Sequence, residues 1–162
     1  MILPEQQALY DYWRGKCQAG KLPTRQDIDP SDICAHLPMV SLIEVKKTTH
    51  KTRFQCRLAG TGFWDLYEEE IQGRYIDELP LVSDRRTYWH RVLSQVANNR
   101  RPTAGVTKPG TKLGSHLAQF WIRLPLSTNG RDVDLILGYD HLAKMPNTEA
   151  AKKQLVPMRV TA

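Results

Sequence analysis

Cysteine is scarce in this sequence, and its three cysteines, Cys17, Cys34 and Cys56, never form a Cys-x-x-Cys pair. This spacing supports neither a zinc ribbon nor a disulfide-stapled scaffold. Long apolar runs are also missing, since no stretch approaches the roughly 20 residues that a membrane-spanning helix requires. Residues 1–7 have no basic region or apolar core of the kind that a signal peptide needs. We therefore expect a cytoplasmic protein without a membrane partner.

The usual signatures of catalysis and of nucleic-acid binding are missing as well. The sequence has no glycine-rich phosphate loop, no nucleophile elbow and no metal-ligand spacing, so we assign no catalytic residue and no metal ligand. The net charge is +6, but the basic residues are scattered and no run of five occurs. Scattered charge is typical of a solvated surface. Nucleic acid is therefore an unlikely partner, although the basic balance keeps it as a minor alternative.

The size and the apolar content of the chain fit one globular domain. The sequence has 162 residues, of which 41% are hydrophobic, and this is enough for a sizeable core. Near the N-terminus, Pro4 and Gly20 bound a predicted helix over residues 4–19. Its apolar stripe comprises Leu9, Tyr12, Trp13 and Cys17. An amphipathic helix of this kind must cover a sheet or another subunit.

A segment rich in proline and aspartate follows this helix. Arg25 lies close to Asp27, Asp29 and Asp32 in the sequence. Two interpretations remain open: Arg25 forms an anion site, or local carboxylates hold it in place and so tie the segment down. We favour the second interpretation on sequence grounds.

Alternating hydrophobic patterns and turn residues predict five strands and two central helices. The strands are expected at 39–46, 52–59, 103–108, 115–126 and 133–140, and the helices at 63–70 and 85–98. This order predicts an α+β fold: a five-stranded antiparallel sheet with helices on one face, and the N-terminal helix packed on the sheet or at a dimer interface. We expect an N-terminal helix and cap segment at 1–38, a core at 39–142 and a polar tail at 143–162, in which 148–155 favours a weak helix.

Period-two alternation also predicts which side chains face the helices. On residues 52–59 we expect Phe54, Cys56 and Leu58 to point inward. On residues 115–126 we expect Phe120 and Ile122 to point inward and Trp121 to point outward. An outward Trp121 would pack on Tyr12 and Trp13, either within one chain or across a homodimer interface. Both arrangements remain open.

The ordered set of motifs resembles the small, mostly single-domain bacterial PAS proteins grouped as PAS family 5. The match runs from about residue 9 to 140 and rests on Trp13 and on the segments 22–25, 27–30, 32–33, 37–38, 54–61, 73–74, 124–127 and 133–138. The resemblance implies a PAS fold and a sensory, non-catalytic role. Because no output domain accompanies this domain, it also implies a signalling protein partner. It supplies no catalytic residue and no shared ligand.

A PAS cavity lies between the sheet and the helices. Two interpretations remain open: the cavity holds a small-molecule ligand, or the same side chains fill it as an ordinary core with no room. We favour the filled core on sequence grounds. The cofactor is unknown. A flavin photosensor would need a cysteine at 62–72, where none occurs, and haem would need a histidine such as His90, which lies away from the apolar stripe of its helix. An enzyme that uses the same cavity is the alternative function. The expected pocket residues are Phe54, Cys56, Leu58, Trp64, Tyr67, Trp89, Phe120 and Ile122.

Overall fold

A computed structural model describes residues 2–145. Five antiparallel strands form one sheet in the order β2-β1-β5-β4-β3. This arrangement confirms the predicted α+β architecture. The strands are β1 (Val40–Lys47), β2 (Thr52–Ala59), β3 (Thr103–Thr107), β4 (Leu117–Leu126) and β5 (Leu135–Lys144).

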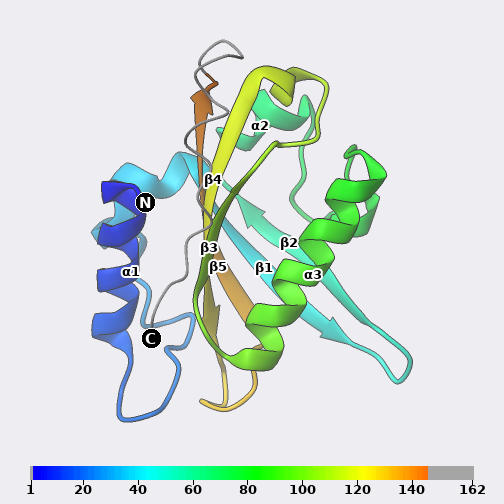
Figure 1. The fold of residues 1–162 in the computed structure, drawn as a ribbon. Helices are drawn as coiled ribbons and strands as arrows, with labels where there is room; N and C mark the ends of the chain where they lie inside the picture. Colours follow the sequence, from blue (N-terminus) through cyan, green and yellow to red (C-terminus); the bar gives the residue numbers. More distant parts are fainter. Residues whose placement is uncertain (1, 146–162) are drawn as a thin grey trace.

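Helices cover both faces of the sheet (Figure 1). On one side lie α1 (Pro4–Lys16) and the 3-10 segment η1 (Pro30–Met39). On the other side lie α2 (Phe63–Tyr67), the short 3-10 turn η2 (Ile76–Glu78) and the long helix α3 (Ser83–Asn99), with a further 3-10 turn, η3 (Leu113–His116), before β4. We call the α3 side of the sheet the inner face and the α1 side the outer face.

Because both faces are covered, the sheet separates two hydrophobic cores. The inner core gathers side chains such as Trp89 and Leu93 of α3. The outer core contains Leu9 and Trp13 of α1. The indole N–H of Trp13 donates a 2.9 Å hydrogen bond to the carbonyl oxygen of Pro125, which fixes α1 on β4. The N-terminal helix therefore packs on its own sheet.

The predicted orientation of β4 is wrong. Trp121 belongs to the inner core, whereas Ile122 and Leu124 belong to the outer core. A strand buried on both faces carries large apolar residues at odd and even positions alike, so its alternation does not reveal which face is which. The polar positions decide the matter here, because Gln119 and Arg123 point inward and bond to a buried carboxylate.

A β-bulge changes the direction of side chains near the end of β2. Ile43 pairs with Cys56, but its neighbour Leu42 pairs with Leu58, so Arg57 is the extra residue on β2. An extra residue shifts the alternation by one position, and Leu58 therefore turns to the outer face while Cys56 stays inward. The prediction that Leu58 faces the inner cavity is wrong for this reason.

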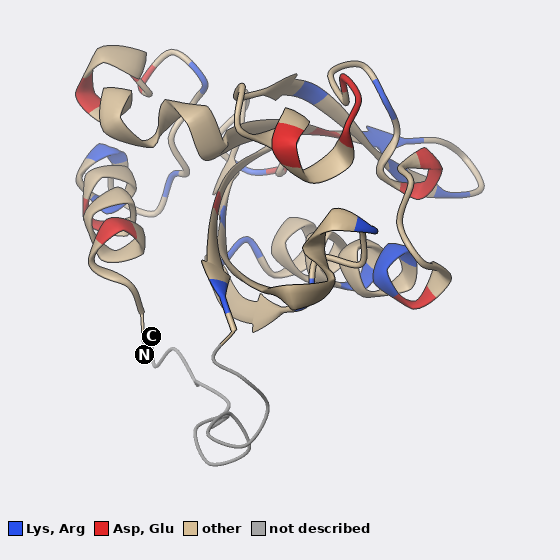
Figure 2. Cartoon of the chain, turned by 90° about the horizontal axis from the view of Figure 1, so that it is seen from above, with Lys and Arg blue, Asp and Glu red and all other residues tan. Residues whose placement is uncertain are grey.

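Charged residues lie on elements of both sides of the sheet (Figure 2). None of the helices within residues 2–145 is long and apolar enough to cross a membrane. The division into cap, core and tail stays a prediction, and most of the predicted tail, with its weak helix at 148–155, lies outside the described residues.

Candidate functional site

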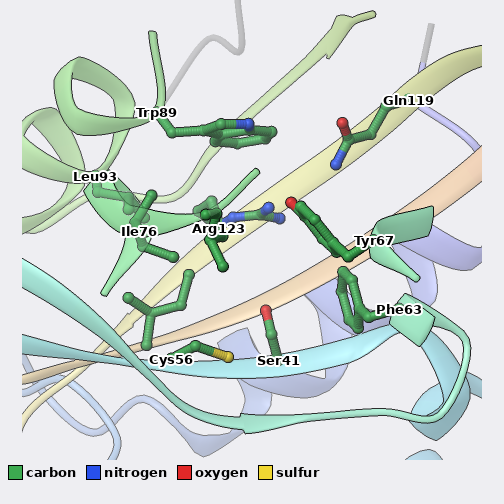
Figure 3. A pocket seen from close by; sticks show the side chains of 11 residues that line it. Ser41, Cys56, Phe63, Tyr67, Ile76, Trp89, Leu93, Gln119 and Arg123 are labelled. Carbon is green, nitrogen blue, oxygen red and sulfur yellow. The ribbon is translucent and has the colours of Figure 1, made fainter. Parts of the chain in front are cut away.

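A small cavity lies between the inner face of the sheet and the helices α2, η2 and α3 (Figure 3). Its volume is about 30 Å³. A cavity of this size holds one or two water molecules at most. Its walls are apolar apart from a few polar side chains that point into it (Figure 3). The lining residues are Ser41, Ile43, Cys56, Phe63, Tyr67, Ile76, Leu79, Trp89, Leu93, Gln119 and Arg123.

The polar part of this wall is a buried network on β4 and β5. Arg123 Nη2 donates to Asp140 Oδ1 at 3.0 Å, and Gln119 Nε2 donates to the same oxygen at 2.7 Å. Arg123 Nη1 also donates to the backbone carbonyl oxygens of Ile122 and Tyr139. The Asp140 side chain is fully buried, so these bonds replace the water that its charge would otherwise need.

A glycine on β5 makes room for the guanidinium. Gly138 lies opposite Arg123 in the ladder. A Cβ atom at Gly138 would lie 2.6 Å from Ser41 Oγ and 3.2 Å from Arg123 Nη1. A side chain at residue 138 would clash with Ser41 and crowd the guanidinium, so a glycine here leaves room for Arg123 to cross the sheet surface.

Two tryptophans enclose the guanidinium of Arg123. Its central carbon lies 4.6 Å from the ring centroid of Trp89 and 5.8 Å from that of Trp121. The Trp121 indole N–H donates to the hydroxyl of Tyr88 at 3.0 Å, and burial raises the pKa of that hydroxyl. Aromatic faces attract a cation and exclude water from it. Arg123 is therefore held between two aromatic rings on the inner face of the sheet.

The network leaves two buried polar atoms without a hydrogen-bond partner among the described residues. These atoms are Arg123 Nε and Asp140 Oδ2. Oδ2 lies 3.0 Å from Arg123 Nη2, which is close enough for ionic attraction, although it accepts no aligned hydrogen bond. An orphaned donor and acceptor in a buried site are costly, and they indicate capacity for a further polar partner.

Two ionisable side chains in the wall are held neutral. Burial raises the pKa of the Tyr67 hydroxyl, and the nearby Asp140 charge raises it further. Figure 3 shows this hydroxyl directed toward the Arg123 guanidinium. Burial also raises the pKa of the Cys56 thiol to about 12. Cys56 is therefore a small apolar group at neutral pH rather than a nucleophile.

The structure brings three of the eight predicted pocket residues to this cavity: Cys56, Tyr67 and Trp89. Phe54 belongs to the same core, but its ring packs edge-on against His90 rather than lining the cavity.

The other four predicted pocket residues lie elsewhere, and these assignments are wrong. Leu58, Phe120 and Ile122 follow the outer face for the reasons given above. Trp64 is 56% exposed. Helix α2 buries Phe63 and Leu66, which are three positions apart, so the adjacent Trp64 points to solvent.

Three important cavity residues escaped sequence reasoning: Ser41, Gln119 and Arg123. One feature of the sequence could have indicated the last two of them. Gln119 and Arg123 share a strand face with Trp121, and the other face of that strand is wholly apolar. Polar residues on such a strand are normally taken as solvent-facing. Here they are paired with Asp140, which occupies the position opposite Trp121.

The three predicted interface residues do not form one surface. Trp13 packs on the outer face of the sheet, and Trp121 packs against Trp89 on the inner face. The hydroxyl of Tyr12 accepts a hydrogen bond from the backbone N–H of Asp29 at 2.8 Å and donates to Asp32 Oδ2 at 3.1 Å. The predicted contact of Trp121 with Tyr12 and Trp13 is therefore wrong, because the sheet lies between them. Across residues 2–145, no three His, Cys, Asp or Glu side chains gather as a metal site would require.

Comparison with known proteins gives one family and one fold. The PAS_5 family model, described as a PAS domain, matches residues 1–140. A light-oxygen-voltage domain solved in work with a flavin analogue shares 17% sequence identity and a TM-score of 0.52, with 77% of this chain and 90% of that chain covered. The LOV protein of Rhodobacter sphaeroides shares 12% identity and a TM-score of 0.50, with 91% of this chain and 74% of that chain covered. At such identities the likeness concerns the fold alone. No curated protein matches the sequence.

Proposed function

This chain belongs to the PAS domain family, and on that premise we propose that it is a non-catalytic sensory module that binds a small polar ligand beside Arg123. The observation that carries the proposal is the buried network of Arg123, Asp140 and Gln119, in which one donor and one acceptor remain unpaired.

The cost of this network supports a role beyond packing. Removing each ion from water costs several kcal/mol even after relaxation, and an apolar core of similar volume is often equally stable. Arg123 and Asp140 are nevertheless buried side by side at the wall of a cavity. A ligand with a hydrogen-bond acceptor beside Arg123 and an apolar face toward Trp89 would satisfy this wall.

Binding would require part of the wall to move. A volume of about 30 Å³ is too small for an organic ligand, so a bound state needs a larger cavity. Phe63 and Tyr67 lie on α2, which has only five residues and is bounded by glycine-containing turns at 60–62 and 73. Displacement of α2 would enlarge the cavity and would also change the solvent-exposed surface of the protein around Trp64. The ligand would thus shift the population between two states of α2.

We propose that this change is read by a protein partner, and that the chain acts in the cytoplasm, where it would form a homodimer. These finer points rest on the family resemblance. The inner network supports ligand binding but does not bear on them.

Native mass spectrometry and absorbance of the gently purified protein test the proposal. We expect a bound small molecule, and Tyr67→Phe should weaken its affinity about fivefold, because a hydrogen bond of about 1 kcal/mol from the Tyr67 hydroxyl to the ligand is lost. Tyr10→Phe is the matched control, since Tyr10 lies beside Trp13 on the outer face. Equal retention in both variants would contradict the proposed position of the ligand. Ligand sensing would be contradicted altogether by two results together: the protein purifies without a bound molecule, and no compound in a screened pool of metabolites raises its melting temperature.

A further inference from the structure

A second and larger hollow lies on the outer face of the sheet. It is a groove of about 560 Å³ between η1 and the paired strands β1 and β2. Ligand pockets usually measure about 300–1,000 Å³, so this groove has the size for a small organic molecule. Leu42 of β1 lines it, whereas the next residue, Ile43, lines the inner cavity. The groove and the cavity are therefore separate sites on opposite faces.

Backbone contacts fix the position of η1 at the β2 end of the groove. Gly60 N–H donates to the carbonyl of Val40 and Gly62 N–H donates to that of Pro38, both at 2.8 Å. A Cβ atom on Gly60 would collide with the carbonyl oxygens of Leu37 and Pro38. Residue 60 must therefore be glycine for η1 to approach the end of β2 so closely. These walls are set by the fold and do not depend on a bound molecule.

The groove is apolar along most of its length. The bulge at Arg57 turns Leu58 onto this face, where it remains 40% exposed, although it is a large aliphatic residue. Ile33 and Leu42 extend the same apolar surface. The side chains that line the groove in the described part of the chain include no carboxylate. The groove is therefore suited to a hydrocarbon body, and no described side chain of its lining is anionic.

One cation lies at the groove. Arg25 lines it, and its Nη1 donates to the backbone carbonyl of Ile28 at 3.0 Å. The nearby carboxylates are occupied elsewhere: Asp27 accepts from the backbone and hydroxyl of Thr24, and Asp29 accepts from those of Ser31. These bonds lower the pKa of both carboxyl groups.

The structure therefore reverses the interpretation favoured from the sequence. Within residues 2–145, Arg25 forms no ion pair: Asp27 and Asp29 accept hydrogen bonds in a turn and at the helix cap, and Asp32 lies 3.7 Å from the Lys16 ammonium. Its guanidinium keeps donors that can bind a carboxylate.

We propose that the outer groove binds a small amphipathic carboxylic acid, with its apolar chain along Leu42 and Leu58 and its carboxylate on Arg25. Charge complementarity and the apolar lining together favour this ligand over a neutral or a cationic one. The proposal goes beyond the sensory function of the inner cavity and does not depend on it.

Titration calorimetry with octanoate and 1-octanol tests the proposal. We expect octanoate to bind at least about tenfold more tightly than 1-octanol, because a charge-assisted hydrogen bond is lost with the alcohol. Arg25→Gln should weaken octanoate binding by a similar factor and abolish the preference for the acid. Arg25→Lys should retain part of that preference. Arg131→Gln, which alters an exposed arginine elsewhere, is the matched control.

Leu58→Glu tests the apolar part of the groove. A second negative charge there should reduce octanoate affinity by about tenfold or more. Leu113→Glu is the matched control, because Leu113 is similarly exposed but lies on η3. Circular dichroism at the working temperature verifies that each variant is folded. Amide shifts induced by octanoate should be largest around Leu58 and smaller at Trp89.

Three outcomes would overturn the proposal. The first is equal affinity for octanoate and octanol with no effect of Arg25→Gln. The second is a set of octanoate-induced shifts that is largest at Trp89 and absent at Leu58, which would place the ligand in the inner cavity. The third is sedimentation as a dimer that Leu58→Glu dissociates, without octanoate binding, which would make the groove a contact between copies of this chain. None of these outcomes depends on whether the protein purifies with an inner ligand.

Discussion

Removal of one partner of the buried Arg123–Asp140 pair should destabilise the protein far more than removal of both. The two side chains are 5% and 0% exposed, and their charged atoms lie 3.0 Å apart. Asp140→Asn keeps the shape of the side chain but leaves the guanidinium without a counter-charge. Stranding a buried charge typically costs about 3–5 kcal/mol. This is a large share of the roughly 5–15 kcal/mol by which a domain is stable.

The double variant Arg123→Met/Asp140→Asn removes both charges and leaves a flexible apolar chain against Trp89. We expect the double variant to be about 1–3 kcal/mol more stable than Asp140→Asn alone, because no buried charge is left without a partner. Urea unfolding followed by tryptophan fluorescence measures each free energy, provided that the denaturant slope is unchanged. Arg53→Met, which breaks an exposed pair with Asp77, is the control and should cost less. Strictly additive single effects, or an Asp140→Asn cost below about 1 kcal/mol, would refute the reasoning.

Three further predictions concern other parts of the fold. Gly60→Ala should destabilise the protein by about 1–3 kcal/mol through its clash with η1, whereas Gly15→Ala, which meets nothing on α1, should stabilise it by about 0.5–1 kcal/mol in the same thermal melt. Trp13→Phe should cost about 1–2 kcal/mol in urea, because it strands a buried carbonyl on β4. Burial raises the pKa of Cys56 from 9.0 to about 12, so only the unfolded state ionises between these values. Stability should therefore fall as the pH rises above about 9, and Cys56→Ala should lessen that fall; an unchanged slope would contradict the burial of the thiol.

The strands and the family could be predicted from the sequence alone, because each strand has a hydrophobic pattern within its own residues. Asn129-Gly130 is a local turn signal in the β4–β5 connection, and Asp29 before Pro30 is a local cap signal at the start of η1, where Asp29 accepts from the Ser31 backbone. These signals are local, so no knowledge of distant contacts was needed.

The faces of the strands were harder to predict, because they depend on contacts between distant segments. Trp121 was expected outside because Arg123 and Gln119 share its face. Their partner Asp140 lies about 20 residues further along the chain, and only the register of β4 with β5 brings it opposite. Leu58 was misplaced by a single bulged residue, since one extra position inverts every side chain beyond it. Half of the predicted pocket therefore lay on the wrong side or in solvent.

The connection from β2 to α2 links the two proposed sites. Cys56 lines the inner cavity and Leu58 lines the outer groove, with only the bulged Arg57 between them. The same connection is tied to η1 by the bond from Gly62 to Pro38, and Phe63 follows at once. A ligand that displaced Phe63 would strain that bond and reshape the groove. If each site binds its own ligand, the resulting change in affinity must be equal in both directions, since coupling free energies are reciprocal. The turn at Gly60-Thr61 would then transmit ligand binding in the inner cavity to the outer groove. Displacement of helix α2 would be a second way for the ligand to change the protein surface.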